Sequence, residues 1–323
     1  MRIKPFLIVI FFAQLHFTSA QEVPAFGKVS TEELTMKECS FDHDAPAMYL
    51  VNEETITYRE DYYGSKTEYE VRERIKIFNS RGYQHATIII PDAKSRSSKV
   101  TDIDAFVYNL DDDGKVKAQK VSRDQIFKEK GSKRKVNSLR FTFPDLKPGS
   151  IVEYRYTKKK QNTMAISPWL FQDQIPTLYS SCKIILPTNV DLQARVVASQ
   201  VKQEDSATAS EETKIHRSRR FTFKHVSGFT VEPYMSSLID NIGRVEFSIS
   251  HRFHFFGATD EQDKWQLLGD NLKYSYFFGM QCNTRVDSTD KVIDSIKKFS
   301  TNDEKINAVY ELVKQSIKWM IAR

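Results

Sequence analysis

The side chains of this sequence best suited to nucleophilic chemistry are three cysteines, Cys39, Cys182 and Cys282. A thiolate nucleophile needs a base, usually histidine, within hydrogen-bond distance and a third group that orients the base. No histidine follows His254, so a Cys–His–Asp order running down the chain from Cys282 is excluded, although folding could still bring an earlier histidine to it. The cysteines form no CxxC pair, and three are too few for a disulfide scaffold. We predict structural or free thiols, with Cys182 buried in an apolar strand and the disulfide pairing of the three left open.

One segment places oxygen atoms at the spacing of a calcium-binding loop. Asn109, Asp111, Asp113 and Gly114 occupy positions one, three, five and six of such a loop. Position twelve is Lys120, where the loop requires a bidentate glutamate, and the flanking residues have strand patterns rather than helical ones. Asp113–Gly114 is also a strong hairpin signal. We therefore predict a hairpin turn without a metal.

The histidines are spaced unfavourably for a metal site. His251 and His254 lie three residues apart in an expected strand, so their side chains point to opposite faces and cannot share one ion. His216 and His225 have no third ligand near them in the sequence. The sequence thus assigns no catalytic, cofactor-binding or metal-binding residue and implies no cofactor.

Aromatic residues offer a different chemistry, the stacking of sugars. Trp169, Phe171, Tyr62 and Tyr63 could form such a platform. The same residue types also build the core of a β-sandwich, and the sequence cannot separate these two roles. We favour packing in the core or at a sheet edge.

The elements that would position these side chains are mostly strands. Apolar and charged residues alternate along Tyr69–Ile77, which predicts a strand with one buried face and one wet face. The apolar set is Tyr69, Val71, Ile75 and Ile77, and the charged set is Glu70, Arg72, Arg74 and Lys76. We expect the charged set to face solvent.

Further strand patterns follow at short spacing, separated by turns such as Leu110–Gly114 and Pro144–Gly149. They are Thr87–Ile90, Asp102–Tyr108, Lys115–Val121, Leu139–Phe143, Ile151–Tyr156, Cys182–Leu186, Leu192–Val197, Arg219–Lys224 and Arg244–Phe256. Gln200–Thr213 is rich in Ser, Thr, Glu and Ala, and we expect a flexible excursion there. Many short strands without intervening helices favour an antiparallel β-sandwich.

The periodicity becomes helical near residue 258. Helices are expected over Asp260–Phe278, over Asp290–Phe299 and from Thr301, which forms a capping box with Glu304. The last helix reaches Arg323 with an apolar stripe and no terminating residue. We interpret the chain as cut short there.

The amino terminus has the features of a secretory signal. Arg2 and Lys4 precede an apolar run from Phe6 to Phe17, and small residues follow it at the expected cleavage site. Gln21 rather than cysteine follows the cut, so a lipid anchor is not expected. No other window approaches the roughly 18 apolar residues that a membrane span requires. We predict export to the periplasm or the exterior, as a soluble protein after signal cleavage.

The composition is that of a globular protein, with 40% hydrophobic and 28% charged residues. The formal net charge of +6 is mild, and we interpret the basic clusters as solvated strand edges. The alternative is the binding of anionic envelope polymers, since an exported protein meets little nucleic acid. The expected organisation is a signal peptide (1–20), an irregular segment (21–44), a β-sandwich domain (45–257) and a helical lead-in (258–323).

An ordered set of motifs lies within the strand region. It comprises FTFPDLKPGSIVEY at residues 141–154, Ser167-Pro168-Trp169, Phe171-Gln172, Ile175-Pro176, Tyr179-Ser180, Val231-Glu232-Pro233-Tyr234-Met235 and the strand Arg72–Ile77. Over roughly Asp44 to Phe256 this set resembles a domain of unknown function that precedes transglutaminase-like domains in many bacterial envelope proteins.

The resemblance implies an immunoglobulin-like β-sandwich without an assigned activity, followed by helices that lead into a papain-like core with a Cys–His–Asp triad. Ile306–Trp319 resembles the first helix of that core, and the nucleophile would come after it, so no catalytic residue carries over to this sequence. The function expected is the non-catalytic N-terminal module of an exported transglutaminase-like protein, not an enzyme by itself. The alternative is a stand-alone exported module that binds envelope proteins, peptides or glycans, and no nucleic acid.

Overall fold

The computed structural model describes residues 23–61, 64–91, 97–130, 137–161, 166–197, 205–251, 266, 269–270, 272–274, 280 and 290–316. The chain divides into two compact units, residues 1–252 and 253–323. The expected signal peptide lies outside the described residues. So do Tyr62, Tyr63, His254 and Cys282, together with most of the helix expected over Asp260–Phe278.

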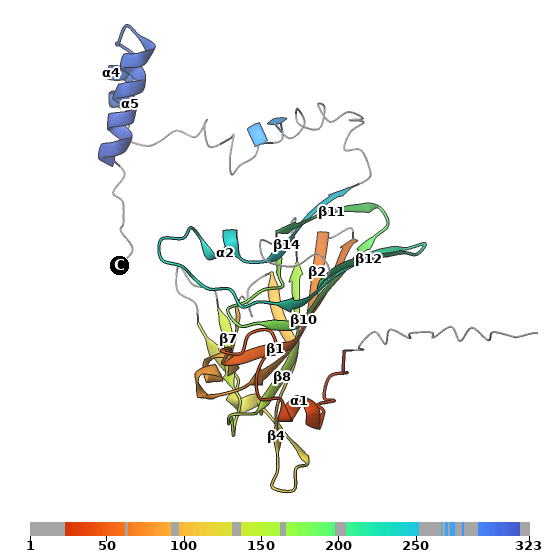
Figure 1. The fold of residues 1–323 in the computed structure, drawn as a ribbon. Coiled ribbons are helices and arrows are strands. Elements are labelled where there is room, and N and C mark those ends of the chain that lie inside the picture. The colour runs from red at the N-terminus through yellow and green to blue at the C-terminus, as the bar shows by residue number, and fades with distance from the viewer. Residues whose placement is uncertain are drawn as a thin grey trace, which may run out of the picture. The chain divides into compact units, whose positions relative to one another are not determined.

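The first unit consists mainly of strands (Figure 1), which confirms the mainly β prediction. The strands are β1 (Ala47–Asp61), β2 (Gly64–Ile77), β3 (Thr87–Pro91), β4 (Ser98–Leu110), β5 (Val116–Lys120), β6 (Phe127–Glu129), β7 (Ser138–Thr142), β8 (Ile151–Gln161), β9 (Trp169–Leu170), β10 (Thr177–Pro187), β11 (Val190–Val197), β12 (Ser206–Glu212), β13 (His216–Val226) and β14 (Arg244–His251). Short helical pieces precede or connect them: α1 (Thr31–Thr35), before β1, and η1 (Ser80–Ala86), η2 (Arg123–Gln125) and α2 (Leu238–Asn241), between strands.

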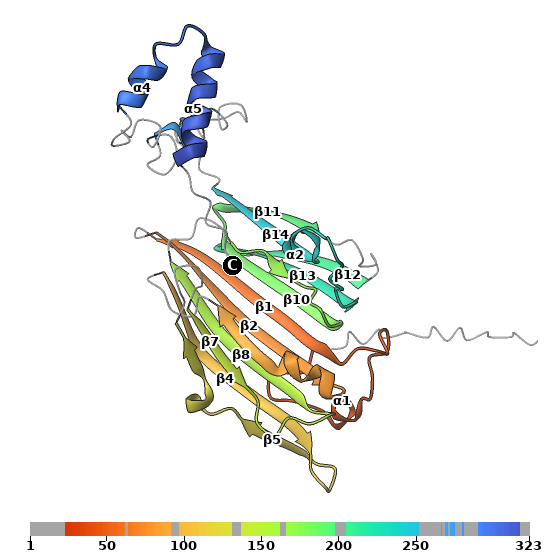
Figure 2. The same ribbon diagram turned by 90° about the vertical axis from the view of Figure 1, so that its left-hand side faces the viewer.

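Eight strands form one large sheet in the order β12-β13-β10-β1-β2-β8-β4-β5. Figure 2 shows its central strands side by side. One neighbouring pair, β10 and β1, is parallel, and every other neighbouring pair of the large sheet is antiparallel. Two three-stranded antiparallel sheets, β3-β7-β6 and β11-β14-β9, complete the unit.

The small sheets pack on one face of the large sheet, which we call the inner face. Ile75 and Val152 of the large sheet pack with Phe141 of β7 in one apolar cluster. Ile184 and Phe223, with Val245 of β14, belong to a second cluster. The inner face is therefore the buried side of a sandwich, as the alternation in β2 predicts.

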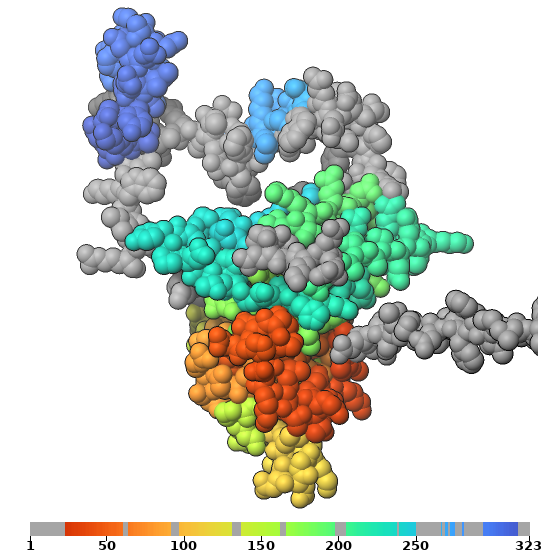
Figure 3. Space-filling view, viewed as in Figure 1, coloured from red at the N-terminus to blue at the C-terminus, as the bar shows by residue number. Residues whose placement is uncertain are grey.

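The opposite, outer face corrects one prediction. Arg74 and Lys76 are fully buried, so the expectation that the charged side of β2 faces solvent is wrong for these two residues. The reason is that residues 23–45, hereafter the N-terminal segment, cover this part of the sheet. Figure 3 shows these first described residues, in red, packed onto the body of the unit. Leu34 and Cys39 of the segment pack with Met48 of β1 in a third apolar cluster.

A second correction concerns Gln200–Thr213, expected to be a flexible excursion. Its part Ser206–Glu212 is strand β12, which pairs along its whole length with β13. All seven residues are exposed, as suits an edge strand with no apolar face to bury. Backbone pairing alone forms this strand, and side-chain composition therefore gave no sign of it.

The second unit contains α4 (Asp290–Ile296) and α5 (Asn302–Ser316). The predicted capping box is confirmed, because the Thr301 hydroxyl accepts from the Glu304 backbone N–H at 3.2 Å and the Glu304 carboxylate accepts from the Thr301 N–H at 3.0 Å. Within the described part of the chain, no helix has both the length and the hydrophobicity to cross a membrane.

Candidate functional site

The N-terminal segment covers a buried group of charges centred on Glu153 of β8. Oε1 of Glu153 accepts hydrogen bonds from Arg74 Nε and Nη2 at 3.1 and 3.0 Å and from Arg72 Nη2 at 3.0 Å. Oε2 accepts from the backbone N–H of Gly27 at 2.9 Å, and Arg74 Nη1 also reaches Glu33 at 2.8 Å. The segment thus supplies partners that buried charges require.

Lys76, the neighbour of this group, ties the segment to the most specific sequence motif. Its Nζ donates to the carbonyl of Leu34 at 2.6 Å and to that of Gly149 at 2.7 Å. Gly149 ends the PDLKPG turn with a φ of +92°, a conformation that glycine adopts without strain. Burial, followed by the charge of Lys37, lowers the pKa of Lys76 to about 8. The motif therefore provides a fixed acceptor for a buried ammonium group.

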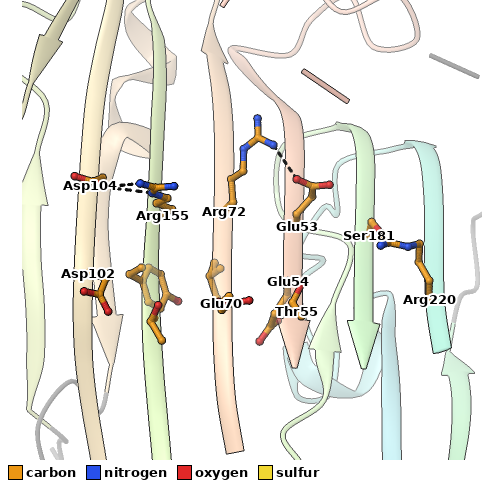
Figure 4. A pocket seen from close by; sticks show the side chains of 13 residues that line it. Glu53, Glu54, Thr55, Glu70, Arg72, Asp102, Asp104, Arg155, Ser181 and Arg220 are labelled. Carbon is orange, nitrogen blue, oxygen red and sulfur yellow. Dashed lines mark hydrogen bonds and ion pairs between the residues drawn. The ribbon is translucent and has the colours of Figure 1, made fainter. Parts of the chain in front are cut away.

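Beside this covered zone, the outer face opens into a charged hollow of about 440 Å³, which we call the outer trough. It runs across six adjacent strands, from Arg220 on β13, through β10, β1, β2 and β8, to Asp104 on β4. Figure 4 shows its side chains in two rows that cross the strands. None of the thirteen residues that line it is a cysteine or a histidine.

The first row of the outer trough is paired internally. Arg72 and Arg155 are direct neighbours across β2 and β8, which would repel each other if left alone. Each is neutralised on its far side: Arg72 Nη1 lies 3.0 Å from Glu53, and Arg155 Nη2 lies 2.9 Å from Asp104. Hydrogen bonds from Lys120 and then Arg155 lower the pKa of Asp104 below its ordinary value. This row is a fixed structural element.

The second row is not neutralised in this way. It holds Arg220 on β13, Thr55 on β1, Glu70 on β2 and Asp102 on β4, which all line the trough (Figure 4). Arg220 donates to the Ser181 hydroxyl at 3.2 Å, and Asp102 accepts from the Thr101 hydroxyl at 2.7 Å. Among the described residues, no ion pair is formed by Glu70, Asp102 or Arg220 at a distance of 4.0 Å or less.

Asp102 owes its position to an irregularity of β4. The register between β4 and β8 shifts between Thr101 and Asp104, and Asp102 has a φ of +55°. A bulge of this kind redirects a side chain, and a positive φ costs a non-glycine residue about 1 kcal/mol or more. The strain places a carboxylate in the trough that regular pairing would not place there.

A further polar cluster lies on the inner face, between the two apolar clusters. Tyr154 donates its hydroxyl hydrogen to Glu73, and Tyr49 donates to Asp173 at 3.0 Å. Burial raises the pKa of Glu73 to about 7, against the opposing hydrogen bond from Tyr154. Burial and the charge of Glu73 raise the pKa of Glu54 to about 7 as well. No sequence pattern marked these glutamates, because their partial burial depends on the packing of strands that are far apart in the sequence.

The two described cysteines are free and buried. Cys182 lies in the apolar strand β10, as predicted, and burial raises the pKa of its thiol well above the ordinary value. Burial also raises the pKa of Cys39. Cys39 packs in the cluster under the N-terminal segment and Cys182 in the inner one, so the sheet lies between them. A high thiol pKa disfavours the thiolate that nucleophilic catalysis needs.

The remaining candidates, the calcium-like loop and the histidines, are not brought together in one site. In the hairpin between β4 and β5, Asp111 Oδ1 accepts from the backbone N–H groups of Asp113 and Lys115 at 3.1 and 2.7 Å, which confirms the predicted turn. His225 pairs with Asp205 at 2.9 Å. Among the described residues, no three His, Cys, Asp or Glu side chains are placed to hold a metal ion.

The two aromatic candidates within the described residues, Trp169 and Phe171, lie in the core. Trp169 is 2% exposed and Phe171 is fully buried. The ring of Phe171 stacks on Phe223 with centroids 3.8 Å apart. They are therefore core residues, as favoured above, and offer no surface to a sugar.

The fold and the outer trough define a β domain of several sheets with one open, charged face. A family model described as a domain of unknown function with a solved structure (DUF3857) matches residues 65–229, and the chain belongs to this family. No curated protein sequence is significantly similar to it.

Among solved structures, a "putative protease" from Parabacteroides distasonis matches with a TM-score of 0.60 and 13% sequence identity, over 84% of this chain and 50% of that protein. The chain thus spans half the length of that protein. An M1 zinc metallopeptidase from Deinococcus radiodurans matches with a TM-score of 0.32 and 9% identity, over 64% of this chain and 42% of the peptidase. The first match shows a shared fold, and the second is too weak for any conclusion.

Proposed function

We propose that the chain is a non-catalytic binding module that belongs to an exported protein of the transglutaminase-like, papain-related class. The module, in this proposal, comprises residues 45–257 together with the N-terminal segment, and residues 258–323 lead towards a catalytic domain. Two comparisons support the proposal: membership in a family without an assigned activity, and a fold shared with half of a longer protein described as a protease.

The observation that carries the proposal is the chemistry of the outer trough. A hollow of about 440 Å³ is within the size range of ligand sites, roughly 300–1,000 Å³. It presents charged groups but no thiol, imidazole or metal-binding set, so its residues suit recognition rather than bond cleavage. In the proposed protein, the module would hold part of a substrate while another domain acts on it.

The same trough supports the second candidate, a stand-alone exported binding module. The two candidates agree on binding and differ in whether a catalytic domain acts on the bound molecule. Under both, residues 1–20 direct export, and the protein works in the envelope or outside the cell.

Enzyme assays of the purified chain test the proposal. We expect neither hydrolysis of casein nor incorporation of a fluorescent amine into it above the blank, and the same result for Cys282→Ala. Turnover that Cys282→Ala abolishes would refute the non-catalytic assignment. Export is tested separately by fusing residues 1–30 to a reporter enzyme that is active only outside the cytoplasm; an inactive fusion would contradict it.

A further inference from the structure

The second row of the outer trough separates charges of opposite sign. Arg220 on β13 lies at one end, and Glu70 on β2 lies towards the other. Lys183, the neighbour of Arg220 on β10, does not line the trough and pairs with Glu211 at 3.6 Å, so Arg220 supplies the positive charge of that end. Strand pairing places Lys183 beside Thr55, and Thr55 beside Glu70, so these side chains belong to one line across the sheet. Asp102 adds a second carboxylate beyond Glu70. The trough thus has a cationic end and an anionic end.

The distance between the two ends follows from sheet geometry. Neighbouring strands lie about 4.8 Å apart, and three such steps lead from Arg220 to Glu70, which gives about 14 Å. An extended peptide rises about 3.4 Å per residue, so about four residues span that distance. A ligand that satisfies both ends therefore carries an anionic and a cationic group about 14 Å apart.

The lining decides between classes of polymer. Glycans are held by exposed aromatic rings, but the ring of Tyr156, the aromatic residue of the trough, stacks on Tyr154 of the inner face with an interplanar angle of 5°. Nucleic acids and other polyanions are disfavoured because aspartate and glutamate outnumber arginine in the lining. A peptide that carries both charges needs no exposed aromatic ring and is not repelled as a polyanion would be.

We propose that the outer trough binds an extended peptide that lies across the strands, with an acidic side chain or terminal carboxylate at Arg220 and a basic side chain at Glu70 and Asp102. The inference rests on the proposed function and names the ligand class of its binding surface. Glu53, Arg72, Arg155 and Asp104 form the fixed wall of the site, because their charges are already paired.

The test uses a fluorescein-labelled heptapeptide, Thr-Glu-Ser-Thr-Ser-Lys-Thr, with blocked ends, in which the two charged residues are four positions apart. Two control peptides have Glu and Lys adjacent, or replaced by Gln. We expect saturable binding of the first peptide by fluorescence anisotropy at low salt, at least tenfold tighter than either control. Raising the salt concentration should weaken it, because exposed charges are screened.

Charge reversals at the two ends locate the binding. Arg220→Glu and Glu70→Lys should each weaken binding of the spaced peptide at least tenfold. Lys117→Glu, a reversal at an exposed position of β5 outside the trough, should leave it within twofold. Arg220→Glu should also gain affinity for a peptide in which Lys replaces Glu.

Equal binding of the spaced and adjacent peptides, no binding of either, or insensitivity to Arg220→Glu would overturn the inference. A melting temperature equal to that of the wild-type protein verifies that each variant is folded. Loss of peptide selectivity with no enzymatic turnover would overturn the ligand class alone, whereas turnover by the chain would overturn the proposed function.

Discussion

The most informative perturbation of the fold is Glu153→Gln. The substitution keeps the size of a fully buried side chain but removes the negative charge shared by Arg72 and Arg74. Arg74 is itself fully buried and would keep Glu33 as its one carboxylate partner. Breaking a buried ion pair by removing one partner typically costs about 3–5 kcal/mol.

Because glutamine still accepts hydrogen bonds, we expect the lower end of that range, a loss of about 3 kcal/mol in the free energy of unfolding. In a domain of this size 1 kcal/mol corresponds to about 2–4 °C, so Tm should fall by about 6–12 °C. The loss should be uneven along the chain. Gly27, whose N–H donates to Glu153, belongs to the N-terminal segment, so amide exchange in that segment should accelerate most.

Urea unfolding followed by circular dichroism gives the stability, and hydrogen exchange with mass spectrometry gives its distribution. Glu68→Gln is the matched control, because Glu68 pairs with Lys159 at 3.1 Å on the surface and such pairs contribute about 0–1 kcal/mol. If Glu153→Gln and Glu68→Gln lost the same stability to within 0.5 kcal/mol, the reasoning about the buried charges would be refuted.

Three further outcomes follow from the structure. Gly82→Ala should cost about 1–3 kcal/mol in urea unfolding, because a Cβ there would lie 2.4 Å from the Pro46 carbonyl oxygen. Wild-type stability should fall as the pH rises from about 4.5 to 7, because the raised pKa values of Glu73 and Glu54, both about 7, favour the protonated folded state at low pH. Glu73 should contribute on the order of 1–3 kcal/mol, and Glu73→Gln should reduce the slope by that amount and leave the part that belongs to Glu54. Cys39 and Cys182 should react with a thiol reagent at least a hundredfold more slowly in buffer than in urea, because both are buried.

Each of these has a contrary outcome. If Gly82→Ala lowered the free energy of unfolding by less than 0.5 kcal/mol, the helical turn η1 would be able to shift away from Pro46 without cost. An unchanged pH slope in Glu73→Gln would assign the slope to other groups, and Glu68→Gln serves as the control for it. Rapid labelling of Cys182 in buffer would show that strand β10 is accessible in the folded state.

Periodicity predicted the inner face of the sheet but not the outer one. In β2 the alternation correctly placed Ile75 and Ile77 in the core. It could not show that Arg74 and Lys76 are buried, because alternation assigns residues to faces and says nothing about what covers a face. The cover lies more than forty residues earlier and acts largely through backbone carbonyls, which have no side-chain signature. Its one readable signal is the capping box from Ser30 to Glu33, which begins α1.

The candidate site was less predictable than the fold. The outer trough depends on register, which brings Arg220, Glu70 and Asp102 together from strands far apart in the sequence. Each of them alone is an ordinary surface charge in the sequence. The bulge at Asp102 has no turn residue to mark it, since it is detectable only from the pairing of β4 with β8.

The contact between Gly27 and Glu153 has a consequence for the order of folding. The two residues are 126 positions apart, and the parallel pairing of β1 with β10 joins residues separated by a similar distance. Contacts of such long range slow folding, because a long loop must close before they form. The N-terminal segment therefore cannot make its contact with Glu153 until β8 has been made and paired. During synthesis, we expect the outer face, including Arg74 and Lys76 of β2, to stay uncovered until nearly half of the chain is in place.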